Sequence, residues 1–424
     1  MEQLVKRLST RSFANNLGRV FSILYRYGLG KRRFSRSVIQ FMDLMERYQA
    51  KPTFPTTAVV LDKNPSLFQR LMKQGAVLAI HGLRHVDYTM MDRTQNASHF
   101  QEAMALFNKA GYPCEGFRFP YLRRDKHRIE WLAEAGFRWD SSEVILWENL
   151  SSRKCSRSRW KNFQTILETY QPMDSGSASL PRFIGEMVEI PVAMPDDDIL
   201  IERLGIRKQE VLAAVWSRML ERACQTGECL VLQLHPERYF QFNRALETIL
   251  RKAQSENVWI ASLQEIAEWW IERDSVQFII RESDSGIKEI CLEGSSRATL
   301  LVKGTKGYTC DGPGNFTVQG TPWKFSGKEH PIVGIDPGCS QDITAWMRQE
   351  GYPYELMNHR QYSTVLLPSD EMKLKRDLSG DYSLPVQGPL MRIWRWPENR
   401  KCCLAVTGDI DGVTIWDFIR RYHE

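Results

Sequence analysis

The stretch Ala79-Ile80-His81-Gly82-Leu83-Arg84-His85 is the part of the sequence on which the fold prediction rests. It overlaps an apolar run, residues 76–80, that predicts a short buried strand. Two histidines four residues apart bring their side chains to one face of a turn, and paired neutral imidazoles are common zinc ligands. A histidine pair without a metal is the competing interpretation of the same spacing.

In the zinc-protease pattern with this spacing, a Glu follows the first His directly and acts as the base. Gly82 occupies that position here. If a metal binds this pair, its third ligand and the base must therefore come from another part of the chain.

Length and composition indicate a soluble globular chain with room for two domains. The 424 residues are 42% hydrophobic and 25% charged. No apolar run reaches the roughly 20 residues of a membrane-spanning helix, and the N-terminus lacks the pattern of a secretory signal. Nine irregularly spaced cysteines predict free thiols and a cytoplasmic location. The net charge of +6 is modest, and no nucleic-acid partner is expected.

Alternating strand and helix patterns predict an α/β domain over residues 35–273, with a largely parallel sheet or barrel. Residues 1–34 are basic with apolar side chains at helical spacing. They predict a docking helix, with a membrane-surface helix as the alternative, and Ser35 is expected to cap the next helix. The predicted strands cover residues 53–61, 76–80, 137–142, 187–192, 229–234 and 258–261. Residues 151–161 are crowded with Ser, Arg and Lys and predict a solvated loop, with binding of an anionic or sugar ligand by this basic cluster, which includes Arg153 and Lys154, as the alternative. Residues 174–179 are a loop by composition.

From about residue 275, short β-rich runs alternate with turn residues, of which Gly312-Pro313-Gly314 is the clearest break. This pattern predicts an antiparallel β-sandwich-like module over residues 275–395. Residues 400–424 then return to the earlier pattern, because a buried strand ends there in Asp409 and Asp411.

Several predicted strands end in a chemically capable side chain. Arg118 follows one strand, His235 follows another, and Asp409 with Asp411 follows the last. Each has a structural explanation by itself, as a salt-bridge partner, a buried histidine or an Asp-Gly turn. Ligand sites in parallel α/β folds lie at the carboxyl ends of the strands, so the joint placement predicts a site.

These motifs resemble those of the metal-dependent polysaccharide deacetylases, carbohydrate esterase family 4. The histidine pair is similar to the family's two-histidine metal motif, and residues 116–121 (Gly-Phe-Arg-Phe-Pro-Tyr) are similar to its Arg-x-Pro-Tyr motif. Residues 232–236 (Leu-Gln-Leu-His-Pro) are similar to its Leu-x-Leu-His motif, and residues 136–142 resemble a strand of many members. The resemblance spans residues 35–273.

One departure from the family is large. The family begins with a strand ending in Thr-Phe-Asp-Asp-Gly or an Asp-x-Asp variant, whereas the matching piece here is residues 407–412 (Thr-Gly-Asp-Ile-Asp-Gly). The resemblance therefore implies a circular permutation, in which residues 400–424 supply the first strand of a (β/α) barrel-like domain. Two alternatives stay open: the tail completes a neighbouring molecule, or it begins a lost second copy.

The resemblance also implies a metal site. His81, His85 and Asp411 would hold a divalent metal, with zinc expected, and leave one position open for water. Asp409 would be the general base, held ionised and oriented by Arg118.

The resemblance implies two further roles. His235 would protonate the leaving amine, and the backbone N–H of Tyr121 would join the metal in stabilising the oxyanion. Family members often use an Asp to orient this histidine, and the sequence leaves Asp140 and the trio 196–198 open for that role.

The expected function is a metal-dependent hydrolase of carbon–nitrogen bonds that removes acetyl groups from N-acetylated sugars of a polysaccharide or glycan precursor. One alternative is hydrolysis of another amide bond in a small molecule. The other is a non-catalytic carbohydrate-binding protein on the same fold, with the β module as the binder and Trp323, Trp346 or Tyr354 as candidate sugar platforms. Retention of the complete set of site residues argues against this last alternative.

Overall fold

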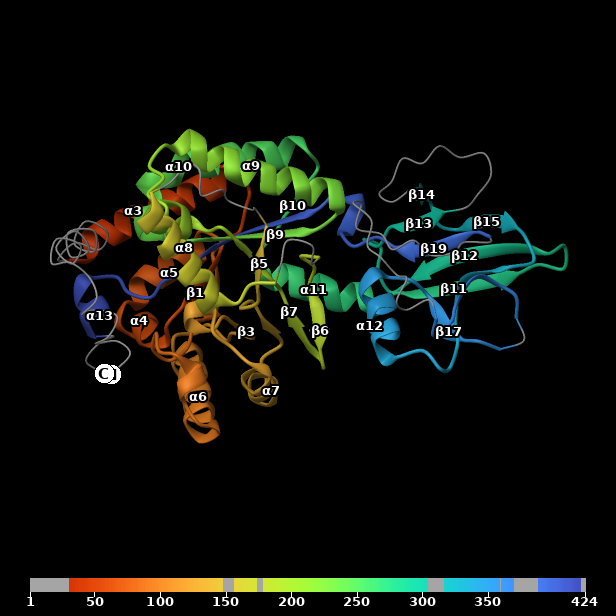
Figure 1. Cartoon of the computed structure of the whole chain (residues 1–424), viewed down its shortest axis with the longest axis horizontal. Helices are drawn as coiled ribbons and strands as arrows, with labels where there is room; N and C mark the ends of the chain where they lie inside the picture. The colour runs from red at the N-terminus through yellow and green to blue at the C-terminus, as the bar shows by residue number, and fades with distance from the viewer. Residues whose placement is uncertain are drawn as a thin grey trace.

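The computed structural model describes residues 30–147, 156–173, 178–303, 316–358, 360–369 and 388–420. Figure 1 shows a larger α/β part joined to a smaller part rich in β-structure. Among the described residues, none of the helices combines the length and the apolar character that crossing a bilayer requires.

The larger part is organised around one curled sheet. Its strands are β1 (Thr53–Thr56), β2 (Val77–Ile80), β3 (Gly116–Phe117), β4 (Trp139–Asp140), β5 (Val144–Leu146), β6 (Arg182–Ile184), β7 (Met187–Glu189), β8 (Val192–Met194), β9 (Cys229–Leu234), β10 (Trp259–Ile260) and β20 (Cys403–Gly408). The strand order is β5-β8-β9-β20-β1-β2-β3-β4-β7-β6, with β10 also paired to β20. Neighbouring strands are parallel except β6 and β7, which confirms the predicted barrel-like (β/α) domain.

Helices surround this sheet (Figure 1). They are α3 (Lys31–Arg47), α4 (Ala58–Lys63), α5 (Pro65–Lys73), α6 (Arg93–Lys109), α7 (Lys126–Glu134), α8 (Arg157–Tyr170), α9 (Gln209–Thr226), α10 (Tyr239–Ser255), α11 (Leu263–Asp274) and α13 (Ile415–Arg420). Short helical turns are η1 (Tyr88–Met90), η2 (Pro120–Leu122), η4 (Asp198–Arg203), η5 (Pro236–Arg238) and η8 (Pro397–Asn399).

The C-terminal strand lies inside the sheet of its own chain. β20 pairs with β9 along its whole length, from Cys403 opposite Cys229 to Gly408 opposite Leu234. On its other side it pairs with β1, where Thr407 lies opposite Thr53, and with β10. The expectation that the C-terminus supplies a strand next to β1 is confirmed.

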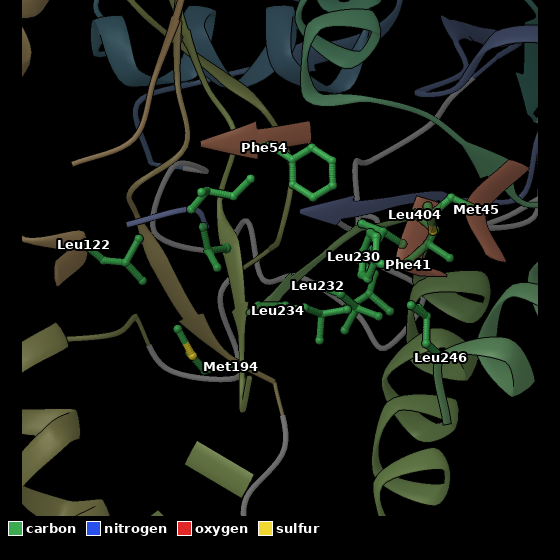
Figure 2. Packing of buried hydrophobic residues seen from close by; sticks show 14 of the residues in the cluster. Phe41, Met45, Phe54, Leu122, Met194, Leu230, Leu232, Leu234, Leu246 and Leu404 are labelled. Atoms are coloured by element: carbon green, nitrogen blue, oxygen red, sulfur yellow. The ribbon is translucent and has the colours of Figure 1, made fainter. Parts of the chain in front are cut away.

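The core explains why β9 and β20 consist mostly of apolar residues along their whole length. Successive side chains of a strand point to opposite faces, and helices cover both faces of a parallel sheet. Figure 2 shows one such face, where leucines of β9 and β20 lie near residues of α3 and α10. The labelled side chains there are Phe41, Met45, Phe54, Leu122, Met194, Leu230, Leu232, Leu234, Leu246 and Leu404.

Two predicted boundaries near the start of the domain are wrong. Ser35 does not begin a helix, because α3 starts at Lys31 and continues through it with Phe34 buried on the inner face. Residues 1–29 of the predicted docking helix lie outside the described residues. The strand predicted for 53–61 ends at Thr56, and the apolar run that follows forms α4. A short apolar run does not distinguish a strand from a buried helix by its periodicity.

The solvated loop predicted for residues 151–161 is wrong from Arg157 onward, because residues 157–170 form α8. Ser156 caps this helix by accepting a hydrogen bond from the Arg159 N–H at 3.4 Å. Phe163 is the residue of α8 that is fully buried, so the helix is polar over most of its surface and its pattern resembles a loop. Arg153, Lys154 and residues 174–177 lie outside the described residues.

The smaller part contains three sheets of three strands within the described residues. Their orders are β11 (Gln277–Glu282)-β12 (Ile287–Glu293)-β15 (Trp323–Ser326), β14 (Thr317–Gln319)-β13 (Leu300–Lys303)-β19 (Leu390–Ile393), and β17 (Tyr354–Leu356)-β16 (His330–Ile335)-β18 (Tyr362–Leu366). The antiparallel expectation holds for the first two sheets. It is wrong for the third, whose strands are parallel because α12 (Gln341–Glu350) crosses from β16 to β17. Gly312-Pro313-Gly314 lies outside the described residues.

The candidate sugar platforms differ in exposure. Trp323 is buried and stacks on Phe325 at a ring distance of 4.6 Å, so it belongs to the core of its sheet. Trp346 is half-buried beside Tyr352, whereas Tyr354 is exposed.

A buried ion-pair cluster ties the smaller part to the strand that leads into β20. Arg395 donates to Glu350 of α12 and, at 2.7 Å, to the carbonyl oxygen of Thr226 at the end of α9. Burial alone would raise the pKa of Glu350, but Arg395 and Arg392 hold it below its usual value. The cluster therefore fixes the point from which the C-terminal strand enters the large sheet.

Because Leu404 is fully buried in β20, we expect Leu404→Ala to lower the free energy of unfolding by about 2–5 kcal/mol. Urea unfolding followed by circular dichroism measures the change. Leu356→Ala, on an exposed part of β17, is the control and should change stability by less than about 0.5 kcal/mol. Equal, small effects of the two substitutions would contradict a docked C-terminal strand.

Candidate active site

The site forms where β1, β2 and β20 end side by side. The His81 N–H donates to the carbonyl oxygen of Thr56 at 2.9 Å, which joins the ends of β1 and β2. The Ile410 N–H donates to the carbonyl oxygen of Pro55 at 2.8 Å and anchors the chain beyond β20. This backbone pairing places Asp409 and Asp411, on either side of Ile410, next to the histidine loop.

Three of the predicted ligands meet in one cluster. Asp411 Oδ1 lies 3.4 Å from His81 Nε2, and Asp411 Oδ2 lies 3.6 Å from His85 Nε2. One ligand atom from each residue lies within 4.8 Å of the others. His81 Nδ1 is 2.8 Å from the carbonyl oxygen of Arg118, which can only accept, so Nδ1 carries the proton and Nε2 presents its lone pair.

This donor set fits a divalent metal. Ligand atoms about 2.0–2.1 Å from a tetrahedral zinc ion are about 3.3–3.4 Å apart, and Asp411 Oδ1 lies at such a spacing, 3.4 Å, from His81 Nε2. Two neutral imidazoles and one carboxylate also suit zinc and neighbouring first-row metals.

The position that a zinc protease would fill with Glu requires a glycine here. Gly82 has a φ of +80°, and a Cβ at this position would come within 2.7 Å of the Tyr88 hydroxyl. That hydroxyl accepts from the Leu83 N–H at 2.9 Å and holds the loop between the histidines. A Glu at position 82 is therefore excluded by the backbone conformation and by Tyr88.

Arg118 and Asp409 form a buried pair beside the candidate metal ligands. Arg118 Nη1 donates to Asp409 Oδ1 at 2.8 Å, and the other oxygen of this carboxylate lies 3.9 Å from His81 Nε2. The guanidinium is fully buried and held by three other contacts: Nε to the Ser141 carbonyl oxygen, Nη2 to the Ser141 hydroxyl, and Nη1 to the Thr407 hydroxyl. The orientation of the guanidinium is therefore fixed by the fold.

His235 lies at the end of β9 and is partnered by a carboxylate. Its Nδ1 lies 2.7 Å from Asp197 Oδ1, and Asp197 is fully buried. Burial alone would lower the pKa of His235, but the charge and the hydrogen bond of Asp197 raise it to about 9. The imidazole is therefore protonated at neutral pH.

Of the carboxyl groups left open by the sequence, Asp197 is the one at hydrogen-bond distance from His235. Asp140 instead accepts from the Ser142 hydroxyl at 2.8 Å, and burial together with nearby Glu189 raises its pKa. Asp198 is bound by Arg238 at 2.7 Å.

Asp196, the remaining acid of residues 196–198, is fully buried. Burial and the charges of Asp197 and Asp198 raise the pKa of Asp196 to about 7.

Tyr121 lies next to the candidate metal ligands in an unusual backbone conformation. Its φ is +61°, a region that non-glycine residues seldom adopt and that is often found at functional sites. Its ring lies edge-on to His85 at 4.3 Å and is partly exposed. Tyr121 therefore lies beside the cluster, with its side chain exposed on one side.

Several site residues were not predicted from the sequence. Ser141 and Thr407 hold Arg118, Ser142 accepts from the Phe119 N–H at 2.8 Å, and Gln233 donates to Asp409 Oδ2 at 2.8 Å. For Gln233 a signal existed, because it is a polar residue in a strand that is otherwise apolar.

Known proteins resemble this chain in sequence and in structure. A sequence profile described as polysaccharide deacetylase matches residues 26–139, and no curated protein matches the chain. Among solved structures, a putative polysaccharide deacetylase from Mycobacterium smegmatis is 17% identical (TM-score 0.41, 61% of this chain and 82% of that chain covered). A probable polysaccharide deacetylase from Pseudomonas aeruginosa is 21% identical (TM-score 0.43, 58% and 75% covered). An allantoinase, Puue, is 19% identical (TM-score 0.42, 55% and 72% covered).

The profile match covers both residues of the histidine pair and the motif at Arg118 to Tyr121. The resemblance inferred from these motifs is thereby confirmed. Residues 26–139 match the polysaccharide deacetylase family, and this match supports a hydrolase that acts on carbon–nitrogen bonds other than peptide bonds.

Proposed function

We propose that this protein removes acetyl groups from N-acetylated sugars of a polysaccharide or a glycan precursor, with zinc as its metal. The observation that carries the proposal is the convergence of two proton-transfer pairs with the candidate metal ligands. Asp409 with Arg118 adjoins the cluster of His81, His85 and Asp411. His235, which Asp197 partners, follows β9, the strand paired with β20.

The metal has a limited role in this scheme. Held by His81, His85 and Asp411, it would supply Lewis acidity, which lowers the pKa of water and polarises an acyl oxygen. The remaining work belongs to the side chains and the backbone of the protein.

Each proton-transfer group has a stated task. Asp409 Oδ2 takes a proton from the attacking water, while Arg118 fixes the carboxylate through Oδ1. His235, protonated at neutral pH, gives its proton to the departing sugar amine, and Asp197 stabilises the imidazolium. The Tyr121 N–H donates to the developing oxyanion.

We also propose the evolutionary and domain arrangement that accompanies this function. Residues 35–273 and 400–424 would form one circularly permuted deacetylase domain, and residues 275–395 an inserted β module. The insertion of β20 between β9 and β1 supports this division. The cytoplasmic location and the sugar partner stay predictions.

Acetate release from N-acetylglucosamine oligomers by the zinc-loaded protein tests the proposed function. Metal binding without acetate release would favour another small-molecule amide as substrate. Glycan binding without metal would favour the carbohydrate-binding alternative.

Loss of one proposed ligand should remove the metal. We expect His81→Ala to reduce the zinc retained after dialysis to less than about a tenth of the wild-type content, because two ligands hold zinc far more weakly than three. Elemental analysis by mass spectrometry gives the content. His127→Ala, on an exposed face of α7, is the control and should retain zinc fully. Full retention in His81→Ala would exclude the proposed metal site.

Asp409→Asn should separate binding from catalysis. We expect zinc content to stay at the wild-type level and kcat to fall by about 10²–10⁴-fold, because an amide cannot accept the proton. The measurement is initial-rate acetate release at saturating substrate. Asp284→Asn, at an exposed turn, should leave the rate unchanged. If Asp409→Asn turned over as fast as the wild type, Asp409 would not be the base.

The His235–Asp197 pair predicts a dependence on pH. Asp197→Asn removes the interaction that raises the pKa of His235 and leaves burial, so this pKa should fall from about 9 to below its ordinary value of about 6.5. Imidazole NMR titration measures it, with Asp140→Asn as a control that leaves it unchanged. In the wild type, this pair makes its full contribution to the free energy of unfolding below about pH 6.5. That contribution is lost as the pH rises through about 9. An unshifted pKa in Asp197→Asn would show that another group sets it.

A further inference from the structure

Gln233 is chemically out of place in its strand. β9 consists of Cys229, Gln233 and four apolar residues, and all six positions are buried. A buried amide is costly unless its polar atoms are hydrogen-bonded, so its presence needs an explanation. Gln233 is 5% exposed, and its Oε1 has no hydrogen-bond partner among the described residues.

The explanation lies in the neighbouring strand. Gln233 is paired in register with Thr407 of β20, and its Nε2 donates to Asp409 Oδ2 at 2.8 Å. An ionised carboxylate only accepts hydrogen bonds, so the NH₂ side of the amide must face it. The contact therefore favours one orientation of the Gln233 side chain, although that orientation leaves Oε1 unpaired.

The carboxylate of Asp409 is thus held at both oxygens. Arg118 binds Oδ1 and Gln233 binds Oδ2, the oxygen that lies 3.9 Å from His81 Nε2. With Arg118 alone, the carboxylate could still turn about its Cβ–Cγ bond, because this torsion has a broad energy profile. A second hydrogen bond at the opposite oxygen restricts that rotation.

We propose that Gln233 is a positioning residue for deacetylation. It holds Asp409 with Oδ2 turned toward the metal ligands, so that the proton acceptor is in place before substrate binds. This inference rests on the proposed function, and it assigns to Gln233 a role that acts through Asp409. Small misplacements of a reacting group cost as much as ~10²-fold in rate, which gives the scale of the expected effect.

The competing explanation is that Gln233 merely helps to hold β20 against β9. A purely structural contact would lower stability without a selective effect on kcat. A double-mutant cycle in the full-length, zinc-loaded protein separates the two explanations, with Gln233→Met removing the amide at nearly constant side-chain length.

In the wild-type background, we expect Gln233→Met to lower kcat by about 10–100-fold, with KM changed less than about 3-fold and zinc content unchanged. In the Asp409→Asn background, the same substitution should change kcat by less than about 2-fold, because no base remains to be positioned. Gln254→Met, an exposed glutamine of α10, is the matched control and should leave kcat unchanged. An unchanged kcat in Gln233→Met, or an equal loss in both backgrounds, would overturn the proposal.

The failure of the proposed function is distinguishable from the failure of this inference. If the wild type releases no acetate, the proposed function fails, and the Gln233–Asp409 contact is then tested by urea unfolding of the same four proteins. Unfolding midpoints that are not additive across the cycle would support the direct coupling of Gln233 to Asp409 on which the inference rests. Additive midpoints would overturn it.

Discussion

The pairing of β20 with β9 and β1 is the interaction on which the site depends. Backbone hydrogen bonds continue past the strand, from the Asp409 N–H to the Leu234 carbonyl oxygen and from the Ile410 N–H to that of Pro55. Without β20, two buried neighbours would each lose a row of backbone partners, which is costly in a sheet covered on both faces. The backbone of the sheet, more than any side-chain contact, therefore brings the two acids to the histidines.

The charges around the site follow the rule that buried ions need partners. Arg118 lies against Asp409, and further hydrogen bonds from the fold, such as that from Gln233, close this pair. His235 lies against Asp197, whose other oxygen is 3.9 Å from Arg238 Nη1. The two pairs are chemically opposite, since one presents a carboxylate and the other a protonated imidazole. An acid and a base can therefore coexist at the ends of neighbouring strands.

Much of this arrangement was predictable because the reactive side chains directly follow apolar runs in the sequence, which mark the ends of strands. The histidine pair, Arg118 and His235 each follow a recognisable apolar run, and the Asp-x-Asp segment ends another. The identity of the residue that orients His235 was not predictable. Asp197 and Asp140 both belong to suitable polar segments, and only the packing of the helical turn after β8 determines which one reaches the imidazole.

The errors have a common physical cause. Short apolar runs such as the one at Ala58 are buried equally well in a helix or a strand, and α8 has too few buried residues to show a clear helical period. The parallel sheet around β16 was not predicted, because its crossover helix α12 is only ten residues long and polar on its outer face. Such a short pattern does not indicate a strand–helix–strand unit.

The separation of Arg118 from Asp409, 291 residues along the chain, also affects how this protein folds. Contacts between such distant segments form slowly, because the entropy of closing a long loop is lost before the contact contributes energy. Prior collapse of the intervening sheets shortens the effective loop between the two residues. The Arg395–Glu350 ion pair then holds β20 close to the large sheet. We therefore expect the cluster around Asp409 and Asp411 to assemble late in folding, after the β-rich part has formed.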